Sequence, residues 1–253
     1  METIKKLDKE ISKQLAISKL GFLHLDYDKE YNLGLFYKEN SKRIAIITYG
    51  FGYDYKNYDP ITLCKESFRA GIHFKEVELV LNKALEKETI TNNIHAHVFY
   101  INNQHTISNT SVPEVNTDTN HLVVYENGEV NYNNLEKVIM ETDEFIDQYL
   151  YIFFSEIETL DDLNSKILDK EDFSNYYKYI FGETGAKVLI IMKLCNSSKY
   201  HEYKNWSDEI ISKQLKDPLY TDYIDVLNSQ QKIMDVVYNY LENRDYNELW
   251  PYI

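Results

Sequence analysis

The sequence predicts an α+β protein, in which an N-terminal, mostly antiparallel sheet with two flanking helices is followed by an all-helical C-terminal part. Short runs of alternating or continuous apolar residues, typical of strands, recur through the first 132 residues. Beyond residue 132 these patterns nearly vanish, and apolar residues recur at helical spacing behind capping residues. We therefore expect an α+β sheet domain over residues 1–132 and a helical domain over residues 133–253.

The first elements are a helix and a three-stranded meander. Residues 3–19 place apolar side chains at helical spacing between lysines and acids, and Gly21 is expected to end this amphipathic helix. Strands are predicted over 22–28, 31–38 and 42–51; the first two alternate, whereas the third is apolar on both faces, as in the middle of a sheet. The connections are short enough for antiparallel hairpins.

Residues 49–60 are rich in tyrosine and glycine, and they predict either an aromatic binding loop or a long turn whose rings cover a sheet end. Residues 61–74 allow two interpretations: Asp59-Pro60 could cap a helix that ends at Gly71, whereas the second half alternates like a strand, which we favour. A helix with one apolar side is predicted over 74–88.

A further strand is expected over 94–101, and a hairpin over 121–132, where Asn127-Gly128 favours a tight turn with left-handed backbone. The remaining predicted elements are all helices, over 134–157, 160–168, 171–181, 184–196, 207–215 and 219–243. Their predicted starts carry the capping residues Thr159, Asp169, Ser207 and Asp217.

The net charge of −14 is concentrated in residues 126–172, which hold 14 acidic residues against three lysines. This charge disfavours nucleic acid and anionic membrane surfaces as partners and favours a protein with a basic surface. The chain start lacks the apolar region of a secretory signal, and the longest apolar runs are too short to span a bilayer. A cytoplasmic location follows as the expectation.

Histidines form one candidate catalytic or metal site. His95 and His97 are two residues apart on a predicted strand, so their rings share a face, and His121 is near in sequence; they could serve a hydrolase or a metal-dependent enzyme. No acidic residue between 89 and 113 completes a metal triad, so polar histidines on a wet sheet face are the alternative. The two cysteines, Cys64 and Cys195, match no metal spacing, and no cofactor is expected.

Paired carboxylates at Glu156/Glu158 and Asp161/Asp162 are a further candidate for acid and base catalysis. The second pair, however, lies in the first turn of a predicted helix, where the helix dipole favours negative charge. We therefore predict a structural role for these acids and a protein that is not an enzyme.

The helix over 134–157 carries the candidate partner-binding surface. At helical spacing, acids and large apolar side chains gather on one side of it, away from the buried stripe. Such a mixture is typical of a surface that binds a basic protein, because charge steers the partner and apolar groups anchor it. The predicted residues are Glu136, Met140, Asp143, Asp147, Tyr151 and Phe154. In the alternative, the three apolar members pack under the C-terminal helices.

The order of an amphipathic helix, Leu20-Gly21-Phe22 and a meander formed by YNLGLFYK and KRIAIITYGF resembles small bacterial α+β proteins of unknown function, including immunity proteins paired with secreted toxins. The run KLCN at 193–196 is similar to the helical tails of some of them. The resemblance implies no catalytic residue; it implies that the protein binds another protein.

These observations lead to one main functional hypothesis. We expect a non-catalytic protein-binding module of the immunity type, which covers a basic site on a partner such as a toxin with its acidic segment. Two alternatives are a hydrolase or metal-dependent enzyme that uses the region of His95, His97 and His121, and a helical adaptor.

Overall fold

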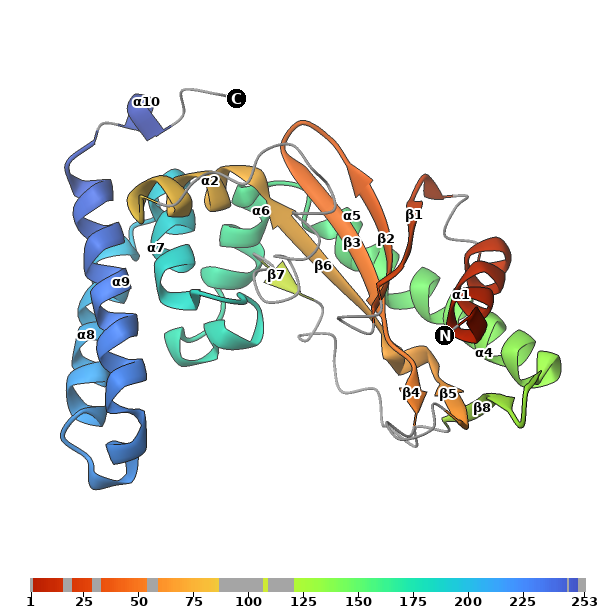
Figure 1. Ribbon diagram of the computed structural model, residues 1–253. Helices are drawn as coiled ribbons and strands as arrows, with labels where there is room; N and C mark the ends of the chain where they lie inside the picture. Colours follow the sequence, from red (N-terminus) through yellow and green to blue (C-terminus); the bar gives the residue numbers. More distant parts are fainter. Residues whose placement is uncertain are drawn as a thin grey trace. The chain divides into compact units, whose positions relative to one another are not determined.

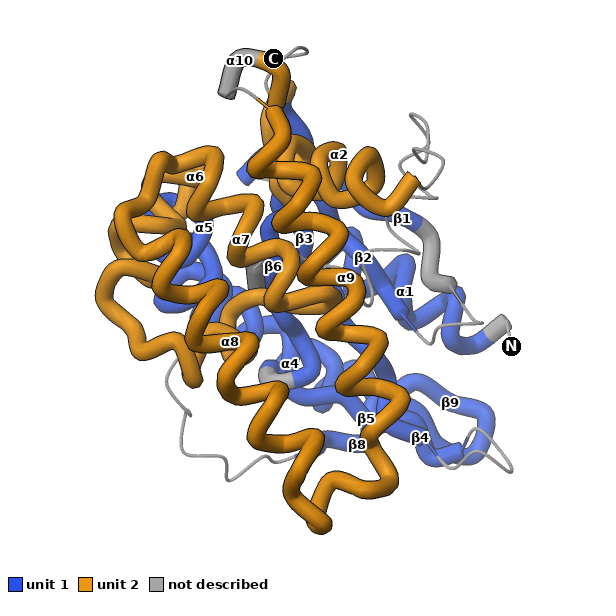
Figure 2. The backbone as a smooth tube through the Cα atoms, turned by 90° about the vertical axis from the view of Figure 1, so that its left-hand side faces the viewer, with its two compact units in different colours: residues 1–40, 44–72, 108–156 blue, residues 41–43, 73–107, 157–253 orange. Residues whose placement is uncertain are grey.

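The computed structural model shows strands and helices in the predicted α+β arrangement (Figure 1). It describes residues 2–15, 20–28, 33–53, 59–86, 107–108, 121–244 and 246–249. Two compact units are formed, and neither is a single stretch of chain (Figure 2). The first unit comprises Met1–Asn40, Ile44–Ile72 and Ser108–Glu156, and the second comprises Ser41–Arg43, His73–Ile107 and Ile157–Ile253. The predicted domain limits, 1–132 and 133–253, stay a prediction.

The larger sheet has the strand order β1-β2-β3-β6-β7. Its strands are β1 (Leu23–Asp28), β2 (Leu33–Glu39), β3 (Arg43–Tyr49), β6 (Phe68–Phe74) and β7 (Ile107–Ser108). The pairs β1/β2 and β2/β3 are antiparallel, which confirms the predicted meander. From Ile44 to Tyr49 every residue of β3 is buried, as the continuous apolar run predicts for an inner strand.

The smaller sheet has the order β4-β5-β8-β9 and lies in the first unit. Its strands are β4 (Gly52–Tyr53), β5 (Ile61–Leu63), β8 (Leu122–Glu126) and β9 (Glu129–Val130). The β8/β9 turn has positive φ at Asn127 (53°) and Gly128 (90°), which confirms the predicted tight turn. The predicted strand over 94–101 lies outside the described residues, as does part of the predicted loop over 49–60.

Three helical pieces follow one another without interruption in the first unit. They are α4 (Tyr132–Phe145), the π-helix η4 (Ile146–Leu150) and α5 (Tyr151–Glu156). The Asn131 side chain accepts a hydrogen bond from the backbone N–H of Asn134 and so caps α4. The amphipathic helix α1 (Glu2–Gln14) and the short 3-10 helix η2 (Lys65–Ser67) also belong to this unit.

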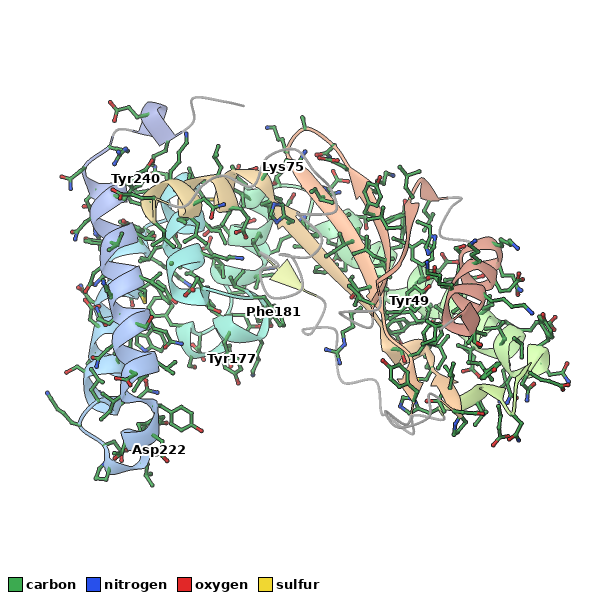
Figure 3. All side chains as sticks on the ribbon, viewed as in Figure 1. Tyr49, Lys75, Tyr177, Phe181, Asp222 and Tyr240 are labelled. Carbon is green, nitrogen blue, oxygen red and sulfur yellow. The ribbon has the colours of Figure 1, made fainter. Side chains whose placement is uncertain are left out.

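Tyr49, at the end of β3, lies at the centre of the first unit's core (Figure 3). Its hydroxyl donates a hydrogen bond to Oδ1 of Asp8 on α1, and Nε2 of His24 lies 3.1 Å from the same oxygen. Its ring stacks on Phe68 with 4.8 Å between centroids. On the paired strand stands Gly34, where a Cβ would lie 2.2 Å from Cζ of Tyr49, so the missing side chain makes room for the ring.

Replacing Tyr49 by phenylalanine tests this core. Asp8 is 2% exposed, so loss of the hydroxyl leaves a buried carboxylate short of one donor. We expect Tyr49→Phe to lower the free energy of unfolding by about 1–3 kcal/mol in denaturant titrations. The control Tyr177→Phe removes a hydroxyl from a side chain that is 65% exposed. Equal stabilities of the two variants would contradict the structural role of the Tyr49 hydroxyl.

The second unit is built mainly from helices. They are α2 (Lys75–Ala84), α6 (Leu160–Leu163), the π-helix η5 (Asn164–Leu168), the 3-10 helix η6 (Phe173–Lys178), α7 (Thr184–Leu194), α8 (Tyr200–Gln214), the 3-10 helix η7 (Pro218–Tyr223), α9 (Ile224–Glu242) and α10 (Tyr246–Leu249). Among the described residues, no helix combines the length and the apolar character needed to cross a membrane.

Two of the four predicted caps are confirmed. Thr159 accepts a hydrogen bond from the N–H of Asp162, and Asp217 accepts one from that of Leu219. The prediction for Ser207 is wrong, because α8 begins at Tyr200 and buries Ser207 in its interior; aromatic packing of Tyr200 and Tyr203 extends the helix toward its N-terminus. The prediction for Asp169 is also wrong, because Asp169 is the C-cap of η5 and Asp172 is the N-cap of the following helix, η6.

Helix α7 is the central element of the second unit and packs against α2, α8 and α9. Its residues from Ala186 to Met192 are all buried, including Lys187, whose Nζ lies 2.5 Å from Oε1 of Glu78 on α2. Burial lowers the pKa of the Lys187 ammonium, and the Glu78 carboxylate opposes this effect. At Gly185 a Cβ would lie 2.5 Å from Sδ of Met234, so glycine permits the close approach of α9.

The buried ion pair predicts a non-additive pattern of stabilities. Lys187→Met leaves the Glu78 carboxylate buried without its cation, and we expect a loss of about 3–5 kcal/mol. The double variant Lys187→Met, Glu78→Leu removes both charges and is expected to recover most of this loss. Chemical unfolding of the natural protein, the single variants Lys187→Met and Glu78→Leu, and the double variant measures the coupling between the two residues. A double variant that loses as much stability as the two single variants together would refute this coupling.

Candidate protein-binding surface

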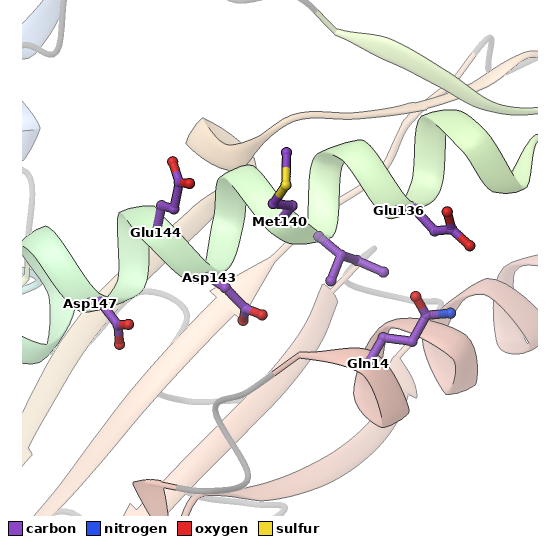
Figure 4. Close-up of a pocket in the computed structure, with 7 residues that line it drawn as sticks. Gln14, Glu136, Met140, Asp143, Glu144 and Asp147 are labelled. Carbon is purple, nitrogen blue, oxygen red and sulfur yellow. The ribbon is translucent and has the colours of Figure 1, made fainter.

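A shallow acidic groove of about 520 Å³ lies in the first unit between α1 and the helix formed by α4 and η4 (Figure 4). It is lined by Gln14, Glu136, Ile139, Met140, Asp143, Glu144 and Asp147. The acidic side chains come from successive turns of one helix, because positions three and four residues apart share a face. Gln14, the last residue of α1, closes the opposite side.

Four of the six predicted partner-binding residues line this groove: Glu136, Met140, Asp143 and Asp147. Tyr151 is 50% exposed but is not part of the lining. The sequence prediction missed Glu144, which is recognisable as the residue one turn beyond Met140. It also missed Gln14, for which no local signal exists, since only the packing of α1 brings it here.

Phe154, the sixth predicted residue, is not on the surface. It is 6% exposed and packs against Phe22, with ring centroids 5.4 Å apart. The prediction assumed a regular α-helix, whereas residues 146–150 form a π-helix. The wider turn sets the phase of the following residues back by roughly one residue, or about 100°, and thereby turns Phe154 into the core.

The groove combines negative charge with an accessible apolar centre. The described lining contains four carboxylates and no lysine, arginine or histidine. Met140, which is 60% exposed, and Ile139 are the apolar members of the lining. An unbranched thioether adapts to partner surfaces of different shape, and clustered carboxylates attract lysine and arginine. This arrangement suits a protein partner better than a small polar substrate.

The histidine region contributes little to a candidate site in the described part of the chain. His95, His97 and His105 lie outside it, so the predicted pair is not described. His121 is exposed, and its Nε2 lies 3.9 Å from Sγ of Cys64, which is only 4% exposed and so closed to a substrate. Among the residues described, no group of three His, Cys, Asp or Glu side chains could hold a metal ion.

Asp162, one of the four paired carboxylates, has the structural role predicted for it. Asp162 completes a capping box with Thr159, and its carboxylate lies 2.7 Å from Nζ of Lys166. The hydrogen bond from Lys166 is the main reason why the pKa of Asp162 falls to about 2. Such a carboxylate is a poor general base at neutral pH.

Comparisons with known proteins place the chain in no family. Protein-family models, curated proteins and solved structures were all searched, and none matches. The function is therefore inferred from the chemistry of the groove itself.

Alanine substitutions distinguish Met140, which is exposed in the groove, from Phe154, which is buried in the core. Phe154→Ala is expected to lower the free energy of unfolding by about 3–5 kcal/mol, since it empties part of the core. Met140→Ala is expected to change it by less than about 0.5 kcal/mol, because the side chain is exposed. Thermal and denaturant unfolding measure both. An unchanged stability of the Phe154→Ala protein would contradict the burial of this ring in the core.

Proposed function

We propose that the protein is a non-catalytic binding module of the immunity type, which covers a basic site on a partner enzyme such as a toxin. The observation that supports this most is the groove, whose lining combines Glu136, Asp143, Glu144 and Asp147 with the exposed Met140. We also propose that the protein meets its partner in the cytoplasm.

The mechanism is steric and electrostatic occlusion. Carboxylates of the groove pair with lysine or arginine side chains that would otherwise hold a phosphate group of the partner's substrate. The charge also steers the encounter and raises the association rate. Met140 then supplies the apolar anchor that such interfaces concentrate near their centre.

The product of the neighbouring gene is the first partner to examine, by surface plasmon resonance at low and high salt. We expect binding that weakens as salt rises, because the groove's charges are exposed to solvent. The triple variant Glu136→Gln, Glu144→Gln, Asp147→Asn should bind at least about tenfold more weakly, chiefly through slower association. Its salt dependence should also be flatter.

A matched control keeps the same change in net charge away from the groove. Glu202→Gln, Asp222→Asn, Asp225→Asn neutralises three exposed acids of the second unit. This variant should bind like the natural sequence. Binding that is absent, that is insensitive to salt, or that falls equally in both triple variants contradicts the proposal.

A further inference from the structure

A second, smaller pocket lies wholly within the second unit and has a volume of about 240 Å³. The start of α2, the start of α6 and the end of α7 converge on it. Its lining consists of Lys42, Phe74, Glu76, Glu158, Thr159, Leu160, Asp161, Leu194, Cys195 and Asn196. The lining thus contains three carboxylates, one ammonium group and three apolar side chains. Outside the lining, the charges of Lys75 and Arg43 also act on Glu76 and Glu158.

The end of α7 adds negative potential to the pocket. Asn196 has a φ of 51°, and the N–H groups of Asn196 and Ser197 donate to the carbonyls of Lys193 and Met192. These two bonds form a Schellman motif, which ends the helix at the pocket wall. The C-terminal end of a helix carries partial negative charge and favours a cation.

Glu76 is the residue that most clearly points to a ligand. It is 9% exposed and lines the pocket. Within the part of the chain that the structure describes, its carboxylate hydrogen-bonds to its own backbone N–H and to no other residue. Burial raises the pKa of this carboxyl, against the weaker opposing effects of that hydrogen bond and of Lys42 and Lys75.

Glu78, two residues beyond Glu76 on α2, provides a contrast. Glu78 is similarly buried, yet it forms an ion pair with Lys187 at 2.5 Å. A buried carboxylate without such a cation is costly, and a cation that enters from solvent would relieve that cost. Lys187 thus forms a close ion pair with one buried acid of α2, whereas the other lines the pocket, where the charges of Lys42 and Lys75 only partly offset its burial.

The thiol of Cys195 does not make the pocket a catalytic site. Burial, followed by the nearby Asp161 carboxylate, raises the pKa of this thiol. A protonated thiol is a weak nucleophile and a poor metal ligand. Its proton can instead be donated to the Asp161 carboxylate.

We propose that this pocket binds an organic cation with a short apolar stem, such as the guanidinium or ammonium end of an arginine-like or lysine-like molecule. Glu76 and Asp161 accept hydrogen bonds from the cation, and Phe74, Leu160 and Leu194 enclose its stem. A metal ion fits less well, because no metal-binding group of three side chains occurs among the described residues. The site is independent of the acidic groove in the first unit.

Titration of the full-length, isotope-labelled protein with n-butylguanidinium, followed by two-dimensional NMR, tests the proposal. We expect saturable shifts of the backbone amides of Leu160, Cys195 and Asn196. The uncharged isostere n-butylurea should cause no saturable shift, since it cannot neutralise a carboxylate. Glu76→Gln should bind n-butylguanidinium at least about tenfold more weakly than the natural sequence.

Two further variants complete the experiment. Asp161→Asn, at an exposed position, should also weaken binding and serves if Glu76→Gln fails to fold. Glu209→Gln, on the exposed side of α8 where it pairs with Lys213, should bind like the natural sequence. Absence of saturable shifts, equal binding of n-butylurea, or unchanged binding by both pocket variants overturns the proposal. Tighter saturation of the same amides by Zn²⁺ or Mg²⁺ overturns the assignment to an organic cation.

Discussion

The hydrogen bond from the Tyr49 hydroxyl to the Asp8 carboxylate is the contact on which the first unit depends. It joins α1 to the inner strand of the larger sheet in a setting where both residues are almost fully buried. Because a buried carboxylate needs its donors, α1 is held in one position on the sheet. That position brings Gln14, at the end of α1, to the edge of the acidic groove. The candidate binding surface is thus a consequence of a polar contact in the core.

The two proposed sites differ in how far their carboxylates are buried. In the groove, the carboxylates face solvent, where their value lies in long-range attraction and in the rate of encounter. In the pocket of the second unit, Glu76 is buried, so a cation there would gain from a less polar surrounding. The first arrangement suits the surface of a large partner, and the second suits a single cationic group.

Local sequence patterns predicted most elements because they depend on interactions between near neighbours. The meander, the Asn127-Gly128 turn and the Thr159 cap all follow from side-chain alternation, backbone preference or a hydrogen bond within a few residues. The cap predicted at Ser207 failed for the opposite reason. The start of α8 is decided by aromatic packing with residues far away in the chain, which no local pattern records.

The candidate surface likewise combines features that local sequence patterns predict with features that distant contacts decide. The sequence by itself determined that acids and Met140 share one side of the helix, because helical spacing alone sets which residues are neighbours on its surface. Only the tertiary structure decided that Phe154 turns inward and that Gln14 closes the groove. A π-helix alters the helical phase without a clear sequence signal, and the approach of α1 depends on a contact between residues 41 positions apart. The neighbours on a helix surface follow from the local sequence, whereas contacts between distant residues decide which side of the helix remains exposed to solvent.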